Sequence, residues 1–242
     1  MTRYLVTGGA GFIGLEYTNA LAHDPSNVVT VIEAMTYAAN PARLDLSGGN
    51  VTVLTRDAAD PALADEVEAA DVIVNFAAET SVDRTNAPAG YAALVKSNVG
   101  VVANLLALIH DRNPRAWFHQ VSTDEVYGPA VEPKTEWDPL RPTNPYSATK
   151  AAAEHLIEAH ARVSGLNYSI SRCCNNVGPG QHVEKLVPTV IRKALTGQPI
   201  PVYGSGLQRR EWISVHDHVR AIQFIIDRRL HGVWNVGTGW SK

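Results

Sequence analysis

Short apolar runs alternate with longer amphipathic stretches along the first 174 residues of the chain. Several of these runs are nearly continuous, which is typical of strands buried on both faces of a sheet. Strands are expected at Tyr4–Thr7, Val28–Ile32, Val51–Leu54, Val72–Phe76, Trp117–Val121 and Tyr168–Ser171. Helices are expected between them at Gly11–Ala22, Pro61–Ala69, Gly90–His110 and Ala148–Val163. This alternation predicts an α/β fold with a doubly wound, Rossmann-type parallel sheet.

The pattern changes after Cys174. Gly, Pro and Asn cluster at Asn175–Gly180, a helical run follows at Lys185–Leu195, and Gly197–Gly206 is rich in turn residues. We therefore predict a Rossmann domain over residues 1–174, to which residues 207–238 partly return. Residues 175–206 and the C-terminal end should form a smaller lobe at the C-terminal edge of the sheet.

Composition narrows the class of protein. The chain has 242 residues and a formal net charge of −3, which argues against a general nucleic-acid surface. No apolar run looks long enough to span a bilayer, and Met1–Tyr4 enters a strand pattern with no sign of a signal peptide. The only two cysteines, Cys173 and Cys174, are adjacent and form no disulfide framework. We expect a cytoplasmic protein that binds neither membrane nor nucleic acid.

A glycine-rich loop, "VTGGAGFIG", links the first strand to the first helix. Gly8, Gly11 and Gly14 stand where a tight turn, a close approach to a pyrophosphate and helix–sheet packing each require glycine. Glu33 ends the next strand, roughly 20 residues on, where an acid binds a ribose 2′-hydroxyl. An acid there favours NAD over NADP. A turn with a helix-packing glycine is the alternative interpretation.

Two further motifs carry candidate chemistry. "PYSATK" places Tyr146 and Lys150 one helical turn apart, and a nearby cation together with a positive nicotinamide ring would lower the pKa of the phenol and make it a usable base. "VSTDEVYG" places Thr123, Asp124 and Glu125 at the end of an apolar strand. Two adjacent carboxylates in different environments can divide the roles of acid and base. The alternatives are an ordinary surface Tyr/Lys pair and an acidic pair that caps a turn.

The chain resembles the extended short-chain dehydrogenases/reductases, and among them the dTDP-glucose 4,6-dehydratases. The resemblance rests on "TGGAGFIG", "TYAAN", "AAETSVDR", "STDEVYG", "PYSATK", "RCCNNVGP", "EKLVP", "PVYG" and "REWISVHDH", which cover nearly the whole chain in order. The adjacent acids after Thr123 are the specific element, since related epimerases and decarboxylases generally lack one of them. Ser81 departs from the family, which usually has His there, and the C-terminal lobe looks truncated.

The resemblance implies a reaction. Tyr146, assisted by Lys150, would take the C4 hydroxyl proton while hydride passes to NAD, and Thr123 would bind the C4 oxygen. Glu125 would remove the C5 proton and Asp124 would protonate the departing C6 hydroxyl. Hydride return to C6 would then give a 4-keto-6-deoxy sugar.

The resemblance also implies binding residues and an assembly. Arg210 would bind the diphosphate and Tyr203 would stack on the base. The two long helices would form a homodimer. For the cofactor, the expected residues are Gly8, Gly11, Phe12, Ile13, Gly14, Glu33, Thr36, Asp57, Ala58, Ala77, Ala78, Tyr146, Lys150 and Cys173. For the nucleotide sugar they are Thr80, Asn175, Asn176, Glu184, Lys185, Tyr203, Arg210 and Asn235.

Other interpretations remain open. The chain could be another NAD-dependent sugar-nucleotide epimerase or decarboxylase, or a shortened homologue that binds NAD without catalysis. Cys173 and Cys174 have no assignable base beside them, so thiol chemistry is not expected. His216 and His218 lack a third ligand, so no metal site is expected.

Overall fold

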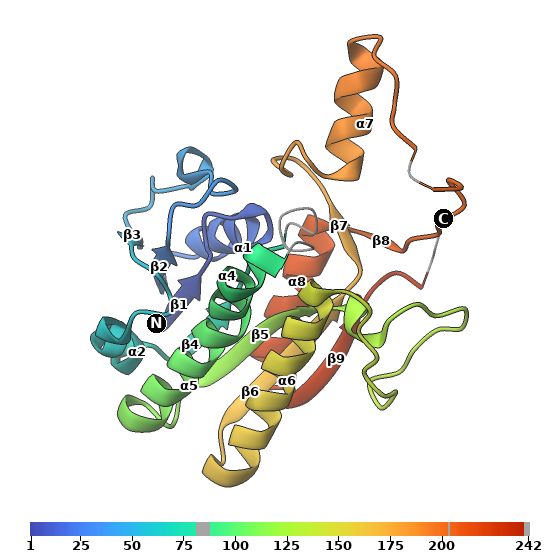
Figure 1. Cartoon of the computed structure of the whole chain (residues 1–242). Helices are drawn as coiled ribbons and strands as arrows, with labels where there is room; N and C mark the ends of the chain where they lie inside the picture. Colours follow the sequence, from blue (N-terminus) through green and yellow to red (C-terminus); the bar gives the residue numbers. More distant parts are fainter. Residues whose placement is uncertain (81–87, 203, 240–242) are drawn as a thin grey trace.

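The computed structural model describes residues 1–80, 88–202 and 204–239. Seven parallel strands form one sheet in the order β3-β2-β1-β4-β5-β6-β9, as Figure 1 shows. This confirms the predicted Rossmann-type fold. The strands are β1 (Thr2–Thr7), β2 (Asn27–Glu33), β3 (Val51–Thr55), β4 (Val72–Asn75), β5 (Trp117–Thr123), β6 (Asn167–Cys173) and β9 (Gly232–Val236).

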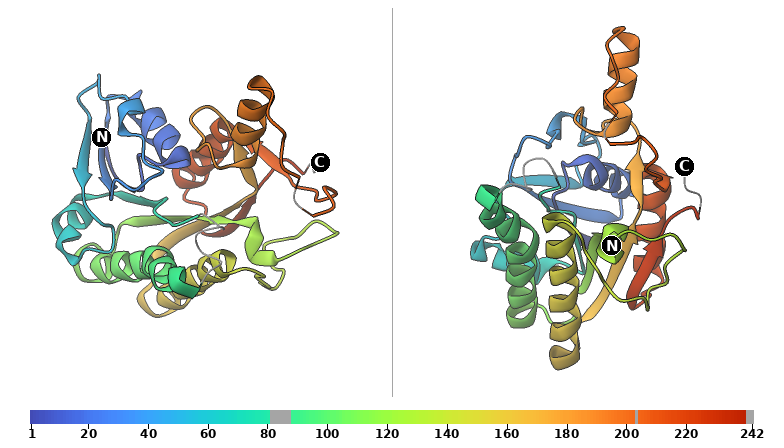
Figure 2. Two further views of the ribbon diagram at one scale, coloured as in Figure 1. Left: turned by 45° about the horizontal axis from the view of Figure 1, so that its top comes forward. Right: turned by 45° about the vertical axis from the view of Figure 1, so that its right-hand side comes forward.

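Helices cover both faces of the sheet, in two layers that are visible in Figure 2 (left). On one face α1 (Phe12–Ala22) and α8 (Val215–Asp227) bury Tyr17 and Ile222 against Val6 and Val74. The other face is covered by α2 (Ala64–Ala69), α5 (Val101–Arg112) and α6 (Pro145–Ser164). The residues packed there include Leu5, Ile73, Phe118, Val67, Leu105 and Ile157. Successive strand residues thus face opposite layers, which accounts for the apolar residues on both sides of β1 and β4.

Helix α6 carries the Tyr/Lys motif and begins three residues earlier than its apolar pattern predicts. Asn144 accepts a hydrogen bond from the Ser147 N–H (2.8 Å) in a capping box, and Pro145 occupies the first turn. Gly165, with φ +73°, ends the helix. The cap therefore places Tyr146 in the first turn and Lys150 in the second.

The predicted helix Gly90–His110 is built from several short pieces. A 3₁₀ turn (η3, Pro88–Gly90), α4 (Tyr91–Val95), a π-helical turn (η4, Lys96–Gly100) and α5 follow one another. The span Pro88–Arg112 is apolar and long enough to cross a bilayer by length and composition alone, which corrects our expectation that no such run exists. In the fold, α5 buries Val101, Leu105 and Ile109 in the core, which accounts for its composition.

The C-terminal part contains elements that the sequence pattern did not reveal. Strands β7 (Asn175–Val177) and β8 (Trp212–Ser214) form a small parallel pair. Helix α8 and strand β9 then join the Rossmann layers, with β9 parallel to β6. Helix α7 (Leu186–Leu195) lies where predicted, projects from the body in Figure 1, and has no buried residue. Three-residue 3₁₀ turns occur at Pro41–Arg43 (η1) and Pro61–Leu63 (η2).

Candidate active site

The glycine loop meets the end of β4 at the carboxyl edge of the sheet. Gly8 has φ +70°, and a Cβ there would lie 2.7 Å from the Ala77 nitrogen. A Cβ on Gly14 would overlap the Gly8 carbonyl oxygen. At Gly11 a Cβ would meet only that oxygen, at 3.3 Å, and otherwise open space. The loop is therefore closed toward the protein and open outward.

The first turn of α1, at Phe12 and Ile13, is free to bind an anion. Gly11 caps the helix, and no side chain of the described residues accepts its first N–H groups. These donors and the open space above Gly11 are what a pyrophosphate requires, so the residues present fit a dinucleotide cofactor.

Glu33 lies at the end of β2, as expected, but it is buried. Its carboxylate accepts the Ala10 N–H at 3.1 Å and also the N–H groups of Ala34 and Met35. Burial raises its pKa in spite of these hydrogen bonds. Besides its predicted position at the cofactor's ribose, Glu33 thus holds the glycine loop against β2.

The other predicted cofactor residues lie along the same edge. Thr36 follows β2, and its carbonyl oxygen accepts the Ala39 N–H at 3.1 Å. Asp57 is bound to Lys96 at 2.7 Å, and this hydrogen bond lowers the pKa of the carboxyl. Ala58 is buried beside it. Ala77 donates to Asn75 Oδ1 at 3.1 Å, and Ala78 comes next in the chain.

The acidic motif forms the 3₁₀ turn η5 (Asp124–Tyr127) directly after β5. Thr123 caps this turn, since its Oγ1 accepts the Glu125 N–H at 3.2 Å. Asp124 is half-buried, and burial, followed by the charge of Glu125, raises its pKa to about 6. Glu125 is exposed and accepts Asn144 Nδ2 at 2.9 Å. The two adjacent acids therefore occupy different environments.

Tyr146 and Lys150 reach the same place from α6. Tyr146 lies beside Thr123, and burial, then the neighbouring groups Glu125, Cys173 and Asp124, raises the pKa of its phenol. The protein by itself therefore raises the pKa of Tyr146, whereas the sequence predicted that a nearby cation and a nicotinamide ring would lower it. Lys150 is 4% exposed and donates to the Val121 carbonyl at 2.6 Å. Burial lowers its pKa to about 8.

Cys173 lines this site from β6 as a neutral thiol. Its Sγ donates to the Ser122 carbonyl at 3.3 Å, and burial raises its pKa to about 12. Cys174 is also buried, with its pKa raised to about 12. His218 is fully buried and contacts Asn176 Oδ1 through Nδ1 at 2.9 Å, and burial lowers its pKa to about 4.

The segment before α7 contacts the loops that follow β2 and β4. Lys185 Nζ donates to the Thr80 carbonyl at 3.1 Å and lies 3.7 Å from Glu184. Tyr37 Oη is 3.4 Å from Glu184 Oε1 and 3.1 Å from Glu79 Oε1. The structure thus brings Glu184, Lys185 and Thr80 together. Tyr37, which the analysis of the sequence missed, stands immediately after Thr36 in the "TYAAN" segment.

Several predicted substrate residues already contact protein groups. Asn175 Nδ2 donates to the Glu211 carbonyl at 3.1 Å, and Asn176 Nδ2 to the Cys174 carbonyl at 3.0 Å. Asn235 accepts the Tyr127 hydroxyl at 2.7 Å and donates to the Lys134 carbonyl. Arg210 is exposed, and its charge acts to lower the pKa of Asp124. Tyr203 and Ser81 lie outside the described residues.

A buried ion pair beneath the site was also missed. Glu154 Oε2 lies 2.7 Å from Arg172 Nη2. Glu154 is four residues after Lys150, and Arg172 directly precedes Cys173. Two signals could have revealed the pair: an arginine at the end of a buried strand, and a glutamate at the inward-facing spacing of a helix.

These features define a Rossmann-fold protein of the extended short-chain dehydrogenase/reductase class. The chain belongs to the NAD dependent epimerase/dehydratase family, whose model matches residues 4–237. The expectation of NAD as cofactor agrees with this family and is confirmed at that level.

Individual relatives carry names that describe different functions. The chain is 43% identical to the low-salt glycan biosynthesis protein Agl12 of Haloferax volcanii, over 97% of this chain and 76% of that protein. It is 42% identical to a dTDP-glucose 4,6-dehydratase of Streptomyces griseus, over 98% and 74%.

The similar solved structures include both a dehydratase and an epimerase. The dTDP-glucose 4,6-dehydratase DesIV of Streptomyces venezuelae, with NAD and TYD bound, has a TM-score of 0.92 at 37% identity, over 99% of this chain and 77% of that one. A UDP-N-acetylglucosamine 4-epimerase of Methanobrevibacter ruminantium has a TM-score of 0.91 at 28% identity, over 100% and 78%. The fold is therefore shared by dehydratases and epimerases.

Proposed function

We propose that this protein is a nucleotide-sugar 4,6-dehydratase that converts dTDP-glucose to dTDP-4-keto-6-deoxyglucose. The observation that carries the proposal is the pair Asp124 and Glu125 beside Thr123 and Tyr146. The pKa of Asp124, raised to about 6 by burial, suits a proton donor near neutral pH. Glu125 is exposed to solvent and suits a base.

The glycine loop, Glu33, Asp57 and the ends of β4 and β6 would hold NAD. When bound, NAD accepts a hydride from C4 of the sugar and returns it to C6. Because burial and three neighbouring groups raise the pKa of Tyr146, the phenol needs further positive charge before it can act as a base. Lys150 is held one turn away, at the Val121 carbonyl.

The remaining roles are those that the family resemblance implies. Tyr146 takes the proton of the C4 hydroxyl, and Thr123, which lies beside Tyr146, orients the C4 oxygen. The C4 ketone makes the C5 proton acidic, and Glu125 removes it. Asp124 then protonates the C6 hydroxyl as it leaves as water.

The substrate would lie between the lobe and η5. Glu184, Lys185 and Thr80, already in contact, would bind the sugar together with Asn175, Asn176 and Asn235. Arg210 would bind the diphosphate, for which a planar guanidinium is suited, and Tyr203 would stack on the base. The thymidine nucleotide is supported by the dehydratase relatives and by the complex of DesIV with NAD and TYD.

Two alternatives have support of their own. The likeness to a 4-epimerase favours another sugar-nucleotide enzyme of the family, and Agl12 favours a glycan pathway. A non-catalytic NAD-binding homologue is the alternative from another class. Asp124 discriminates between the dehydratase and the epimerase, because it has a role in dehydration and none in simple epimerisation.

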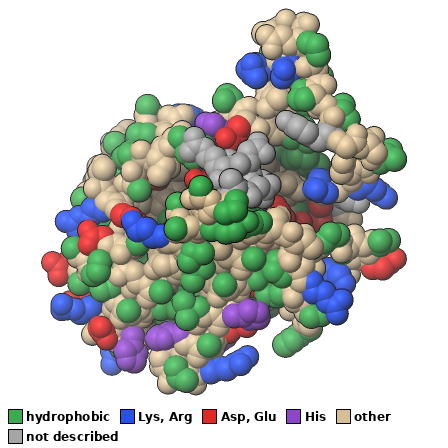
Figure 3. Space-filling view, in the orientation of Figure 1, with side chains coloured by type: hydrophobic (Ala, Val, Ile, Leu, Met, Phe, Trp, Pro, Cys, Tyr) green, Lys and Arg blue, Asp and Glu red, His purple; other side chains and the backbone are tan. Residues whose placement is uncertain are grey.

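We also propose a homodimer and a cytoplasmic location. Helices α5 and α6 flank a groove of about 290 Å³, lined by Ala103, Leu106, Ala107, His110, Asp111, Leu156 and His160. Figure 3 shows apolar side chains gathered on the front of the molecule, where Figure 1 shows α5 and α6. Such a face is suited to packing against the same helices of a second copy. The free, buried thiols fit a reducing compartment.

The test is incubation of the NAD-loaded protein with dTDP-glucose and, separately, UDP-glucose. A dehydratase gives a 4-keto-6-deoxy product, detected by its absorbance in base. A C4 epimer of the substrate would instead support the epimerase, and neither product would support the non-catalytic homologue.

A further inference from the structure

A buried charge network lies directly beneath the candidate catalytic residues. The side chains of Arg172 and Glu154 are 4% and 1% exposed. Arg172 donates to Glu154 Oε2 through both Nη2 (2.7 Å) and Nε (2.9 Å), so one carboxylate oxygen accepts two hydrogen bonds from the guanidinium. Glu154 Oε1 also accepts the hydroxyl of Ser122, the residue before Thr123. The pair therefore joins α6 and β6 to the end of β5.

The network continues into the turn that carries the two acids. Arg172 Nη1 donates to the Tyr127 hydroxyl at 2.7 Å, and its guanidinium lies 4.8 Å from the centre of the Tyr127 ring. Tyr127 is the last residue of η5, which begins at Asp124. Its hydroxyl in turn donates to Asn235 Oδ1 at 2.7 Å. Both ends of η5 are thus fixed, one by Thr123 and the other by Arg172.

Stability alone does not account for this arrangement. A buried ion pair generally contributes little relative to apolar side chains of the same size, because both charges lose their hydration. The pair instead fixes the positions of α6, β6 and the end of β5 relative to one another. Val121 and Ser122 are held through their carbonyl oxygens by Lys150 and by the thiol of Cys173. These hydrogen bonds join α6 and β6 to β5, and the three elements carry Tyr146, Cys173 and Thr123, which are expected to face the cofactor or the substrate.

We propose that Glu154, Arg172 and Tyr127 are positioning residues that hold Asp124 and Glu125 in register with Tyr146 on α6. The inference rests on the proposed dehydratase function. It assigns the network to the elimination step, because Tyr127 shares its turn with both acids, whereas Glu154 lies eight residues beyond Tyr146 on α6.

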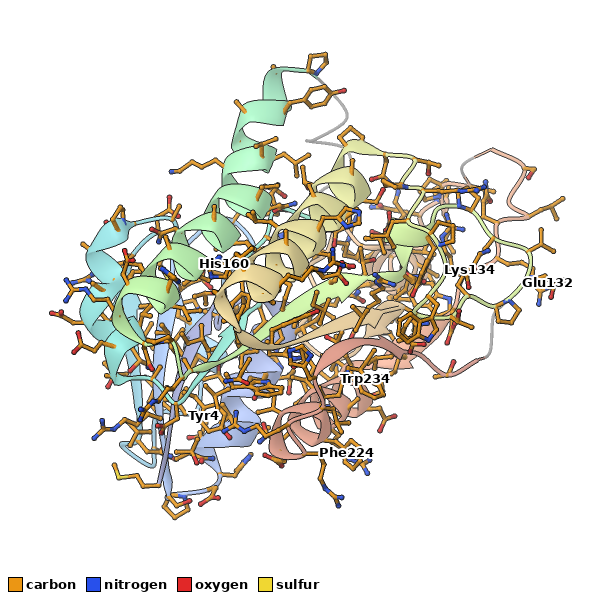
Figure 4. The ribbon with its side chains drawn as sticks, turned by 90° about the horizontal axis from the view of Figure 1, so that it is seen from below. Tyr4, Glu132, Lys134, His160, Phe224 and Trp234 are labelled. Carbon is orange, nitrogen blue, oxygen red and sulfur yellow. The ribbon has the colours of Figure 1, made fainter. Side chains whose placement is uncertain are left out.

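The decisive variant is Tyr127→Phe, which keeps the ring and removes only the hydroxyl between Arg172 and Asn235. Arg172→Lys is the second variant, since it keeps the charge beside Glu154 and loses the planar fork. The matched control is Tyr4→Phe. Tyr4 is 5% exposed, against 6% for Tyr127, and its hydroxyl accepts Gln223 Nε2 at 3.2 Å. Figure 4 shows Tyr4 on the opposite side of the molecule from Lys134. The Lys134 carbonyl accepts a hydrogen bond from Asn235 Nδ2, so Lys134 marks the position of the network.

The first readout needs no turnover. Hydrogen–deuterium exchange of peptides covering 122–128 is expected to become faster in Tyr127→Phe and Arg172→Lys but not in Tyr4→Phe, with the far-UV circular dichroism of all three unchanged. Unchanged exchange in both network variants would overturn the inference.

The second readout separates the steps. In a single turnover with dTDP-glucose, Tyr127→Phe should reduce the cofactor at the parent rate and reoxidise it more slowly. We expect kcat to fall about ten- to hundredfold, as a small misplacement of reacting groups predicts, with KM nearly unchanged. If the parent turns over and the variant matches its kcat, the inference is wrong. If the parent converts no sugar, the proposed function fails, and the exchange experiment alone decides the inference.

Discussion

Asp124 and Glu125 are neighbours in sequence, yet the fold gives them different surroundings. Asp124 is half-buried beside Thr123 and Cys173, whereas Glu125 faces solvent and Asn144. Asn144 also caps α6, so a single amide links the proposed base to the helix that presents Tyr146. The proposed division of labour between the two acids would therefore depend on their environment and not on residue type.

Glu125→Gln should separate oxidation from elimination. The amide cannot take the C5 proton, so the reaction should stop after oxidation at C4, and the absorbance of the reduced cofactor should persist in a single turnover. Asp124→Asn should behave similarly but less completely, because water can protonate the leaving hydroxyl. Tyr146→Phe is the control and should give no reduced cofactor. Turnover of Glu125→Gln at the parent rate would make Glu125 a structural acid.

Asp124→Asn should also change how stability depends on pH. The folded pKa of Asp124, about 6, lies above its ordinary value of 3.8. The stability linked to this group is therefore fully present below the ordinary value and is lost as pH rises through about 6. Ionised Asp124 thus destabilises the fold, and Asn removes that cost. Thermal melts should show a higher Tm than the parent at pH ~8 and a smaller difference at pH ~4; an equal or larger gain in acid would contradict this.

At the scale of elements, the glycine loop packs so closely on neighbouring backbone that Gly8 and Gly14 have no room for a side chain. Gly14 lies in the first turn of α1 with the Gly8 carbonyl oxygen against it, and Gly8 packs on the backbone of Ala77. Helix α1, β1 and the end of β4 therefore meet through backbone atoms. The anion site at the start of α1 exists only while this close packing holds.

Gly14→Ala should weaken NAD binding and lower the free energy of unfolding by about 1–3 kcal/mol, because the new Cβ overlaps the Gly8 carbonyl oxygen. Gly100→Ala is the matched control. Its Cβ would lie 3.8 Å from the nearest atom, the Val95 carbonyl oxygen, and Gly100 has helical φ and ψ. That variant should leave NAD affinity unchanged and gain about 0.5–1 kcal/mol of stability. Titration with NAD and chemical denaturation measure both effects, and equal affinities in the two variants would refute the assignment.

At the scale of the whole molecule, the candidate active-site residues lie at the carboxyl edge of the sheet. The proposed contact with a second copy lies on one of the two helical layers. The groove between α5 and α6 lies on the outer side of helices whose inner sides pack on the sheet. A dimer through this layer would bury the groove and leave the carboxyl edge of the sheet free for ligands.

Ala103→Arg should shift the protein toward monomer, since Ala103 is exposed and lines this groove. Two new charges would face each other across a two-fold axis. Ala69→Arg, at an exposed alanine that ends α2 on another part of the surface, should leave the association unchanged. Light scattering over a range of concentrations measures both, and a parent that is monomeric at working concentrations would contradict the proposed dimer.

The sequence by itself determined the sheet, its first six strands and the position of the catalytic motifs. Long apolar runs and glycine spacing act locally, so their meaning can be read from neighbouring residues. Gly8 and Tyr146 could therefore be proposed as candidates before any contact was known, and Thr123 was proposed from the family resemblance. Strands β7, β8 and β9 were missed because they are short or partly polar and gain their identity only from pairing with distant partners.

Only the tertiary structure decided what surrounds each functional group. The raised pKa values of Asp124 and Tyr146, the buried position of Glu33 and the engagement of Asn176 and Asn235 all depend on residues far away in sequence. The pair Glu154 and Arg172 is separated by 18 residues and is paired because α6 packs on β6. Burial and charge proximity are properties of the assembled layers, and desolvation acts on a side chain only after those layers have closed around it.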